Sequence, residues 1–386
     1  MRRKLLYVVT EDWSFTLHRL PMARAARDAG YEVHVATRVV DCRLQIEAEG
    51  FILHPIALQR GSLNPLALLR TVSDLRRIYK SVRPDIVHHV ALAPAVLGSL
   101  AALGLPLHKL DALTGLGFVF TSATPKARML RPFVRRLLVF LLTRPGTTVL
   151  VQNPDDGAMA EQLGVRPDRV ALIPGSGVDV DALLPLPEPE GPFTVGFVGR
   201  LLYDKGVHIL VQAQQLLSKR GLPFRLLLAG TPDASNPASI PPALLDQWRH
   251  ADGVVLLGQV SDIATVWAEA HVAALPSRRE GLPKSLLEAA ACGRPMVATD
   301  VPGCREIVRD DVTGLLVPPE DAEALADAIE RLMHDRELRL RYGAAARHAA
   351  VEGFASKRVG GDIVALYGRM LAEDRSRAPA GTPVTP

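Results

Sequence analysis

Short apolar runs alternate with helix-like segments along most of this chain. The runs have the length and the β-branched character of buried strands. The segments between them repeat their apolar residues with a helical period, as in 20–29, where Gly30 is a suitable C-cap, and in 66–80. The expected strands are 5–10, 32–37, 51–56, 86–90, 148–152 and 170–173 in the first half, and 193–198, 225–229, 254–257, 272–275 and 296–299 in the second.

A proline-rich stretch, 181–192 (DALLPLPEPEGP), divides this alternation into two halves. Nearly continuous apolar strands that alternate with helices are typical of parallel sheets covered by helices on both faces. The fold class is therefore predicted to be α/β, with two Rossmann-like domains facing across a cleft. The expected parts are a first domain at 1–180, a linker at 181–192, a second domain at 193–352, a helix at 353–374 that crosses back to the first domain, and a flexible tail at 375–386.

The composition agrees with a folded two-domain protein. Of the 386 residues, 48% are hydrophobic and 22% are charged, which is enough apolar material for two cores and excludes a disordered chain. The net charge of +4 suits either a nucleic acid or phosphate-bearing substrates near an anionic membrane, so it does not by itself decide the partner. The histidines show none of the spacings of a zinc site, and no metal site is predicted.

The protein is expected to lie in the cytoplasm. Its three cysteines, Cys42, Cys292 and Cys304, form no C-x-x-C pair, which favours a reducing compartment over a disulfide framework. The first ten residues begin like a signal peptide, but their apolar run is short and is followed by Glu11 and Asp12. No apolar segment approaches the ~20 residues that span a bilayer.

The densest group of candidate functional residues lies in 271–301 (HVAALPSRREGLPKSLLEAAACGRPMVATDV). A strand is expected to end just before a loop that carries Glu280, and Pro283 suits the first position of the helix that follows. At such a helix N-terminus, the backbone N–H groups of Gly281 and Leu282 could bind an anion.

Two carboxylates, those of Glu280 and Glu288, lie on either side of this anion site in the sequence. A ligand that is part phosphate and part polyol, such as a nucleotide sugar, would place its hydroxyl groups on them. Two solvated carboxylates are the alternative. That alternative is weakened because an unpaired charge is unusual among the apolar neighbours of Glu288, which are Leu286, Leu287, Ala289 and Ala290.

A second group, in 195–206 (VGFVGRLLYDKG), supplies positive charge. A strand ends at Gly199, Arg200 follows directly, and Lys205 precedes the next helix. Two cations at the carboxyl end of a strand would suit a diphosphate leaving group. Each charge at ~4 Å contributes roughly 4 kcal/mol at an effective dielectric of ~20, which can replace a metal ion. Taken alone, either cation could equally be a surface residue of a turn.

The two groups together resemble a known family. The spacing Glu280-x7-Glu288, with V-G-R-L and Lys205-Gly206 upstream, is similar to the donor domain of family-4 glycosyltransferases, which are retaining enzymes of the GT-B fold. The resemblance extends over roughly residues 5–367, because similar segments stand at 114–119, 175–179, 236–240, 276–277, 298–303 and 314–318.

The resemblance implies a role for each matching residue. Glu280, Arg200 and Lys205 would be the catalytic residues, with both cations on the donor diphosphate and Glu280 on hydroxyl groups of the transferred sugar. Glu288 would bind the ribose hydroxyls. In this family the leaving phosphate accepts the acceptor proton in a front-face attack, so no metal, no cofactor and no carboxylate nucleophile are expected. The remaining donor contacts would come from Gly199, Gly281, Leu282 and Pro283.

The subgroup that the chain most resembles attaches N-acetylated hexoses or related sugars to polyprenyl-diphosphate intermediates and exported polysaccharides. The expected function is transfer of a hexose or N-acetylhexosamine from a nucleotide sugar, expected to be a UDP-sugar, to a lipid-linked or polysaccharide acceptor in cell-surface glycan synthesis. The expected partners are the nucleotide sugar and this acceptor, with no nucleic acid. The protein would then act as a peripheral protein at the inner face of the plasma membrane.

Alternatives remain open on the residues alone. A sugar-nucleotide epimerase of the same two-domain plan would consume a donor without any acceptor, and a phosphorylase would need a pyridoxal-binding lysine that nothing in the sequence marks. A non-catalytic donor-binding subunit of a transferase complex usually lacks one of the catalytic charges, whereas this chain has all of them.

Candidate contacts to the sugar or the acceptor lie in the first domain. Many family members have a Gly-Gly loop after the first strand, whereas this chain has EDWSFTLHR at 11–19, in which His18 and Arg19 form a polar pair that could face the cleft. His88 and His89 lie in an apolar strand, and because side chains alternate, they would face opposite sheet surfaces. One of them could contact the ligand, and a hydrogen-bonded core position is the equally weighted alternative.

Residues 129–144 (MLRPFVRRLLVFLLTR) predict a peripheral membrane contact. Phe133, Leu137 and Phe140 recur at helical spacing, and the arginines around them could meet lipid phosphates. An ordinary helix packed on the first sheet, with its arginines in water, is the alternative. The lipid-linked acceptor that the resemblance implies favours the membrane interpretation.

Overall fold

The computed structural model describes residues 2–58, 64–113, 125–234 and 236–377. The chain forms two compact units. The first contains the residues up to Ser176 and those from Val359 onward, and the second contains Gly177–Arg358. The family-like segment at 114–119 and the part of the tail from 378 onward lie outside the described residues.

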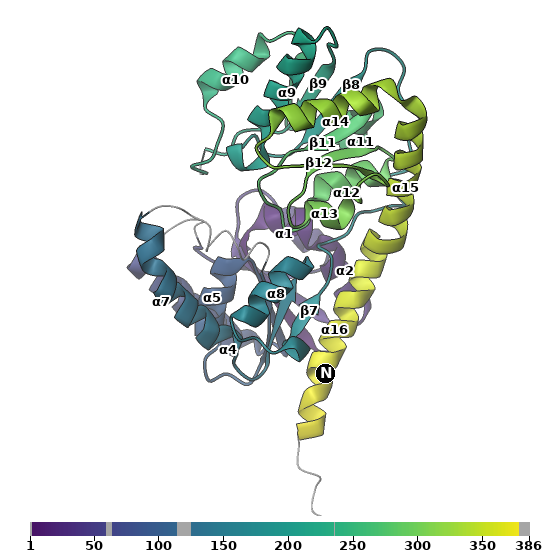
Figure 1. Cartoon of the computed structure of the whole chain (residues 1–386). Helices are drawn as coiled ribbons and strands as arrows, with labels where there is room; N and C mark the ends of the chain where they lie inside the picture. Colours follow the sequence, from purple (N-terminus) through teal and green to yellow (C-terminus); the bar gives the residue numbers. More distant parts are fainter. Residues whose placement is uncertain (1, 59–63, 114–124, 235, 378–386) are drawn as a thin grey trace, which may run out of the picture. The chain divides into compact units, whose positions relative to one another are not determined.

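The first unit is built on a seven-stranded sheet in which all neighbouring strands are parallel (Figure 1). The strand order is β3-β2-β1-β4-β5-β6-β7. The strands are β1 (Lys4–Glu11), β2 (Glu32–Arg38), β3 (Ile52–Pro55), β4 (Ile86–Val90), β5 (His108–Ala112), β6 (Thr147–Val151) and β7 (Val170–Leu172). The helices are α1 (Asp12–His18), α2 (Leu20–Asp28), α3 (Arg43–Ala48), α4 (Pro65–Val82), α5 (Leu92–Ala101), α7 (Pro125–Leu142), α8 (Pro154–Gln162) and most of α16 (Ser356–Arg377).

Strand β1 shows how helices cover both faces of this sheet. Side chains alternate along a strand, so Leu5, Tyr7 and Val9 pack with residues of α2 and α16, whereas Leu6 and Val8 pack with residues of α4 and α5. A strand that is buried on both faces is predominantly apolar along its length. This is why the run was recognisable in the sequence.

Helix α16 contributes to the first unit from Val359 onward. Val359, Ile363 and Tyr367 recur every four residues and place one apolar stripe in the core that contains β1. Only Ala355 separates α16 from the preceding helix α15 (Arg336–Phe354). Both helices lie toward the C-terminal, yellow end of the colour scale (Figure 1). The helix was expected to begin at 353, and in the structure it begins three residues later.

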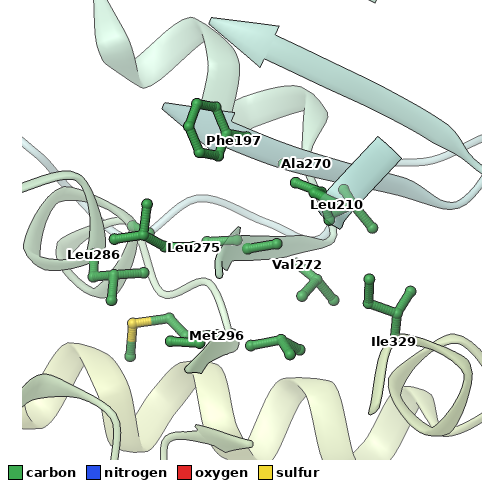
Figure 2. Close-up of a cluster of buried hydrophobic side chains, with 14 of the residues drawn as sticks. Phe197, Leu210, Ala270, Val272, Leu275, Leu286, Met296 and Ile329 are labelled. Atoms are coloured by element: carbon green, nitrogen blue, oxygen red, sulfur yellow. The ribbon is translucent and has the colours of Figure 1, made fainter. Parts of the chain in front are cut away.

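The second unit contains a six-stranded sheet, again with all neighbouring strands parallel, in the order β10-β9-β8-β11-β12-β13. Its core joins side chains of the central strands to those of α9, α12 and α14, and Figure 2 shows Phe197, Leu210 and Ile329 within it. The strands are β8 (Thr194–Val198), β9 (Arg225–Ala229), β10 (Val254–Gly258), β11 (Val272–Leu275), β12 (Met296–Thr299) and β13 (Gly314–Val317). The helices are α9 (Val207–Lys219), α10 (Pro242–Arg249), α11 (Ile263–Glu269), α12 (Lys284–Ala291), α13 (Cys304–Ile307), α14 (Ala322–His334) and α15.

Two strands are missing from the expected set. Strand β5 contains Lys109 and Asp111, which are buried and hydrogen bonded instead of solvated. Strand β13 has only four residues and begins with Gly314. A prediction that requires a continuous apolar run of strand length overlooks both kinds of strand.

The proline-rich stretch 181–192 is held on the second unit and does not form a free linker. The N–H of Leu186 donates to the carbonyl of Cys292 at 3.1 Å, and the guanidinium of Arg347 donates to the carbonyl of Leu183 at 2.6 Å. The prolines of this stretch have no N–H to donate. Residues of the second unit instead pair with backbone N–H and carbonyl groups of the other residues in the stretch. The units therefore divide at 176/177 and at 358/359, instead of at 180/181 and 352/353.

The strand order reverses between two central strands of each sheet, β1 and β4 in the first unit and β8 and β11 in the second. At such a point the connections leave toward opposite sides, and the carboxyl ends of the two strands border a crevice that commonly binds a ligand. The loops after β8 and β11 contain Lys205 and Glu280. The topology thus selects the same loops as the motifs do.

These two loops approach each other backbone to backbone at Gly206. This residue has a φ of 69°, and a Cβ atom added to it would lie 1.8 Å from the carbonyl oxygen of Pro276. A side chain would therefore meet both an unfavourable backbone conformation and a rigid neighbour. Glycine allows the loop after β8 to lie directly against the loop after β11.

We expect Gly206→Ala to destabilise the second unit much more than Gly221→Ala does. Gly221 has a similar positive φ of 80° but no atom within 4 Å of an added Cβ, so it controls for backbone strain alone. That strain costs about 1–2 kcal/mol, and the clash at Gly206 adds roughly 1–3 kcal/mol. Urea unfolding followed by the fluorescence of Trp248 and Trp267 measures the difference. Equal losses in the two variants would contradict the close contact.

Candidate functional site

The centre of the candidate site is an ion pair between the loops after β8 and β11. Lys205 closes a short 3-10 turn (Tyr203–Lys205) before α9, and its Nζ lies 2.5 Å from Oε1 of Glu280. The Glu280 side chain is only 9% exposed, so solvent screens this pair weakly. The structure therefore brings together two residues that the sequence analysis placed in separate motifs.

Glu280 has a second partner, Ser277, which the sequence analysis did not single out as a site residue. The hydroxyl of Ser277 donates to the same Oε1 atom at 2.7 Å, and the serine is fully buried. The carbonyl of Ser277 accepts a hydrogen bond from the hydroxyl of Thr299, at the end of β12. The sequence signal was limited to the family-like dipeptide at 276–277.

Arg200 follows β8 directly and is paired with a different acid. Its Nη1 lies 2.6 Å from Oδ2 of Asp233, which follows the neighbouring strand β9. The backbone N–H of Asp233 donates to the hydroxyl of Ser239 at 3.1 Å, which fixes this loop locally. No sequence pattern marked Asp233, because its importance comes from the pairing of β8 with β9.

Helix α12 begins at Lys284, so Pro283 is its N-cap and not its first helical residue. Proline has no backbone N–H, and neither the N-cap nor the first helical residue needs one for an intrahelical hydrogen bond. The sequence is therefore compatible with proline at either position. The loop that contains Gly281 and Leu282 lies just before the cap. Gly303, at the start of α13, packs against this loop, because a Cβ added to it would lie 2.6 Å from the carbonyl oxygen of Gly281.

Glu288 lies inside α12, and its side chain is only 13% exposed. Burial raises the pKa of Glu288 above its usual range, and Lys284, one turn earlier with its Nζ 3.5 Å away, partly opposes the shift. The apolar neighbours in the sequence had weakened the alternative of a solvated Glu288, and in the structure this side chain is largely buried. A buried carboxylate with a raised pKa makes Glu288 a candidate functional residue.

The paired charges of the site could bind phosphate and hydroxyl groups. Three cation–carboxylate pairs lie beyond the carboxyl ends of three adjacent strands, β9, β8 and β11. The pairs are Arg200–Asp233, Lys205–Glu280 and Lys284–Glu288. The cations can exchange a carboxylate for a phosphate, and the carboxylates can accept hydrogen bonds from hydroxyl groups. Among the described residues, no group of three or more His, Cys, Asp or Glu side chains is arranged to hold a metal ion.

His88 and His89 are both fully buried in the first unit. Nδ1 of His88 lies 2.7 Å from the hydroxyl of Tyr367 on α16, and burial lowers the pKa of His88 well below its usual value. His89 bonds to Tyr79 and to Asp111, at 2.9 and 2.5 Å. Helices cover both faces of the sheet, so neither histidine reaches the surface. Of the two alternatives that the sequence left equally weighted, the hydrogen-bonded core position describes both residues in this structure.

His18 and Arg19 lie at the junction of α1 and α2, after β1. His18 is partly exposed, whereas Arg19 is only 3% exposed and its Nη1 donates to the sulfur of Met22 at 3.7 Å. Burial lowers the pKa of Arg19, and no described carboxylate pairs with it. Of the expected polar pair, His18 alone is therefore accessible on the first unit.

Helix α7 exposes aromatic rings beside arginines. Phe133 is 66% and Phe140 is 48% exposed, Arg135 and Arg136 are exposed, and the guanidinium of Arg144 lies 4.3 Å from the centre of the Phe140 ring. Leu138 and other residues of the same helix are buried, so the helix also packs on the unit. Within the part of the chain that the structure describes, no helix is long and apolar enough to cross a membrane.

We expect Glu288→Gln to raise the melting temperature of the ligand-free protein, and to do so in a pH-dependent way. With a raised pKa in the folded state, the wild-type carboxylate disfavours folding as the pH rises above the pKa of the unfolded chain, and this cost is complete above the folded-state pKa, whereas glutamine stays neutral. The gain should be largest near pH 8 and should vanish near pH 4, where glutamate is largely protonated in either state. Thermal melts over this range measure it, with exposed Glu269→Gln as the control. A gain that is independent of pH would contradict the assignment.

Two families match the chain. The family described as "Glycosyl transferases group 1" matches residues 192–335, a range that contains all the charged residues of the candidate site. The family described as "Glycosyl transferase 4-like" matches residues 4–153 of the first unit.

Individual proteins align over nearly the whole chain. The N,N'-diacetylbacillosaminyl-diphospho-undecaprenol alpha-1,3-N-acetylgalactosaminyltransferase of Campylobacter jejuni is 25% identical over 367 residues, which is 92% of this chain and 95% of the relative. Sucrose-phosphate synthase from Thermosynechococcus elongatus has a similar structure, with a TM-score of 0.82, 22% identity and coverage of 96% of this chain and 100% of that one.

A further solved structure, Anabaena HepE in complex with UDP and glucose, has a TM-score of 0.78 and 20% identity, with 95% of this chain and 99% of that chain covered. At these identities the solved structures establish the shared fold alone. Together with the two family matches and the two parallel sheets, they lead to one conclusion: the chain resembles the family-4 glycosyltransferases in both of its units and has the GT-B fold.

Proposed function

We propose that this protein is a retaining, metal-independent glycosyltransferase. In this proposal it transfers a hexose or N-acetylhexosamine from a UDP-sugar to a lipid-linked or polysaccharide acceptor in cell-surface glycan synthesis. The observation that carries the proposal is the Lys205–Glu280 pair, a cation and a weakly exposed carboxylate in the loops where the strand order of the second sheet reverses.

The donor diphosphate binds to Arg200 and Lys205. Both cations are already held in place by carboxylates, so the diphosphate meets two side chains that are ordered before it binds. The ammonium of Lys205 has three N–H donors, so it can contact the diphosphate and keep its contact with Glu280. At an effective dielectric of ~20 each contact at ~4 Å contributes roughly 4 kcal/mol to the stabilisation of the leaving group. This is the role that a metal ion has in other transferases.

The two carboxylates bind the hydroxyl groups on either side of the diphosphate. Glu280 accepts from the transferred sugar, and Glu288 accepts from the ribose. The apolar surroundings of Glu288 strengthen such hydrogen bonds, because water competes poorly there. The backbone of Gly281 and Leu282 and the start of α12 lie beside the phosphate, where the helix dipole favours negative charge.

The chemical step requires one proton transfer. The bond between the anomeric carbon and the leaving phosphate oxygen breaks, the acceptor oxygen attacks on the same face, and the phosphate takes the acceptor proton. Configuration is retained without a covalent enzyme intermediate. The cations lower the energy of the developing diphosphate charge, and Glu280 holds the sugar in position during the attack.

The nature of the substrates is inferred from the relatives. The Campylobacter jejuni relative is named for transfer of N-acetylgalactosamine to a diphospho-undecaprenol acceptor, and the HepE structure contains UDP and glucose. The first supports a membrane-linked acceptor for this chain, and the second supports a UDP-sugar donor. We therefore place the protein at the cytoplasmic face of the membrane, with His18 on the first unit as a candidate acceptor contact.

Helix α7 provides the proposed membrane contact. Its exposed Phe133 and Phe140 supply apolar surface, and Arg135, Arg136 and Arg144 supply positive charge that anionic headgroups attract. The described part of this helix has no acidic residue to oppose that attraction.

We expect Glu280→Gln and Lys205→Ala to lower turnover by about 10²–10³-fold without changing the melting temperature by more than a few degrees, because each removes a contact made to the reacting sugar or leaving group. Purified protein is incubated with UDP-, GDP- and TDP-sugars, with and without a polyprenyl-diphosphate-sugar acceptor, and the released nucleotide is measured. The control is Glu320→Gln, which breaks a more exposed pair with Arg278.

Acceptor-dependent release from one donor supports the transferase and names its sugar. Release without any acceptor would instead indicate epimerase-like chemistry or hydrolysis, and release from none would favour a donor-binding subunit. EDTA should leave turnover unchanged. Near-normal turnover in both variants, or loss of activity with EDTA, would overturn the proposed site or its metal independence.

We expect the double variant Phe133→Ser, Phe140→Ser to lose most of its binding to vesicles that contain anionic lipid. Flotation with vesicles of phosphatidylglycerol and phosphatidylcholine measures the bound fraction, and high salt should weaken the wild-type binding. Leu172→Ser, which changes an exposed apolar residue on β7 of the same unit, is the control. Unchanged flotation of the double variant would show that α7 is not the contact.

A further inference from the structure

We propose that Ser277 is a positioning residue that fixes the Glu280 carboxylate so that one of its oxygens is kept for the substrate. The inference rests on the proposed function, because it assigns Ser277 to the carboxylate that binds the transferred sugar. It adds a residue that touches neither the sugar nor the diphosphate in that scheme and acts only through Glu280.

The hydrogen bonds to Glu280 are strongly asymmetric. Ser277 Oγ and Lys205 Nζ both approach Oε1, at 2.7 and 2.5 Å, whereas no described residue donates to Oε2. A carboxylate oxygen has two lone-pair directions, so two donors saturate Oε1. Oε2 is then the atom that remains for a ligand hydroxyl.

Ser277 is suited to hold this orientation because it is itself fixed. Its side chain is fully buried just after β11, and its carbonyl accepts from the Thr299 hydroxyl at the end of β12. The Gly206 contact with Pro276 supports the same loop from the other side. A short side chain on a fixed backbone has little freedom to move, and it transmits the position of the sheet to the carboxylate.

Lys205 alone would leave the carboxylate free to turn. The terminal torsion of glutamate has a broad energy minimum, and a lysine ammonium on a flexible stem can follow either oxygen. With only that partner, the carboxylate can rotate to present Oε1 or Oε2, and the oxygen offered to the sugar is no longer defined. The hydroxyl of Ser277 removes this freedom, and a displacement of about 1 Å at such a contact can cost roughly 10²-fold in rate.

The prediction is that Ser277→Ala lowers kcat for the UDP-sugar by about 10–100-fold while the affinity for UDP alone changes less than twofold. UDP lacks the sugar that Glu280 binds, so a role confined to Glu280 leaves UDP binding intact. In a double-mutant cycle, Ser277→Ala should have no further effect on kcat in the Glu280→Gln background, because the group it positions has already been altered.

The experiment measures kcat, KM and UDP affinity for the wild type, both single variants and the double variant, with melting temperatures for each. Thr194→Val is the matched control, since Thr194 is a buried hydroxyl of the same unit whose partner is the carbonyl of Pro192. If Ser277→Ala fails to fold, Ser277→Cys replaces it, because a thiol has a similar shape and is a weak donor.

Three outcomes would overturn the positioning role. These are near-normal kcat in Ser277→Ala, a parallel loss of UDP affinity, and a loss of kcat that adds fully to that of Glu280→Gln. The proposed function fails separately, since in that case Glu280→Gln itself retains normal turnover. A severe Glu280→Gln defect with an unaffected Ser277→Ala leaves the transferase proposal standing and removes Ser277 alone.

Discussion

The parallel pairing of β8 with β11 is the constraint on which the candidate site depends. These strands are neighbours in the sheet although 73 residues separate Val198 from Val272. Because both strands end at the same edge, their loops meet, and Lys205 can bond to Glu280. The glycine contact at Gly206 and the Ser277 hydrogen bond both occur within this meeting of two loops.

The strands that the sequence predicted best are those buried on both faces. The limits of β4, β9, β11 and β12 agree with the expected runs, because a parallel strand covered on both faces is predominantly apolar. Strand β5 is the instructive failure, since Lys109 and Asp111 look like surface residues. Their partners, Ser99 and His89 among them, come from other elements and make burial of these charges possible.

Only part of the candidate site could be predicted, because only part of it is marked by local sequence patterns. Arg200, Lys205, Glu280 and Glu288 belong to local patterns at the ends of predicted strands, and the structure places them in the expected loops and helix. The partner of Arg200 follows no local pattern, because Asp233 comes from the loop after the neighbouring strand β9, and Ser277 was marked only by the family-like dipeptide at 276–277. For His88 the sequence left a ligand contact and a core position equally weighted, since the hydrogen-bond partner that marks the core position, Tyr367, is 279 residues away on the returning helix.

The pairing of every cation in the site with a carboxylate has a consequence for how a ligand arrives. Arg200, Lys205 and Lys284 are matched by Asp233, Glu280 and Glu288, so the ligand-free site carries little net charge. An uncompensated basic site would attract a dianion over a Debye length or more and would accelerate its capture at low salt. In this protein the paired charges cancel at a distance, and attraction to an anion develops only at contact. Encounter of an anionic ligand with this site is therefore governed by ordinary diffusion and should vary little with ionic strength.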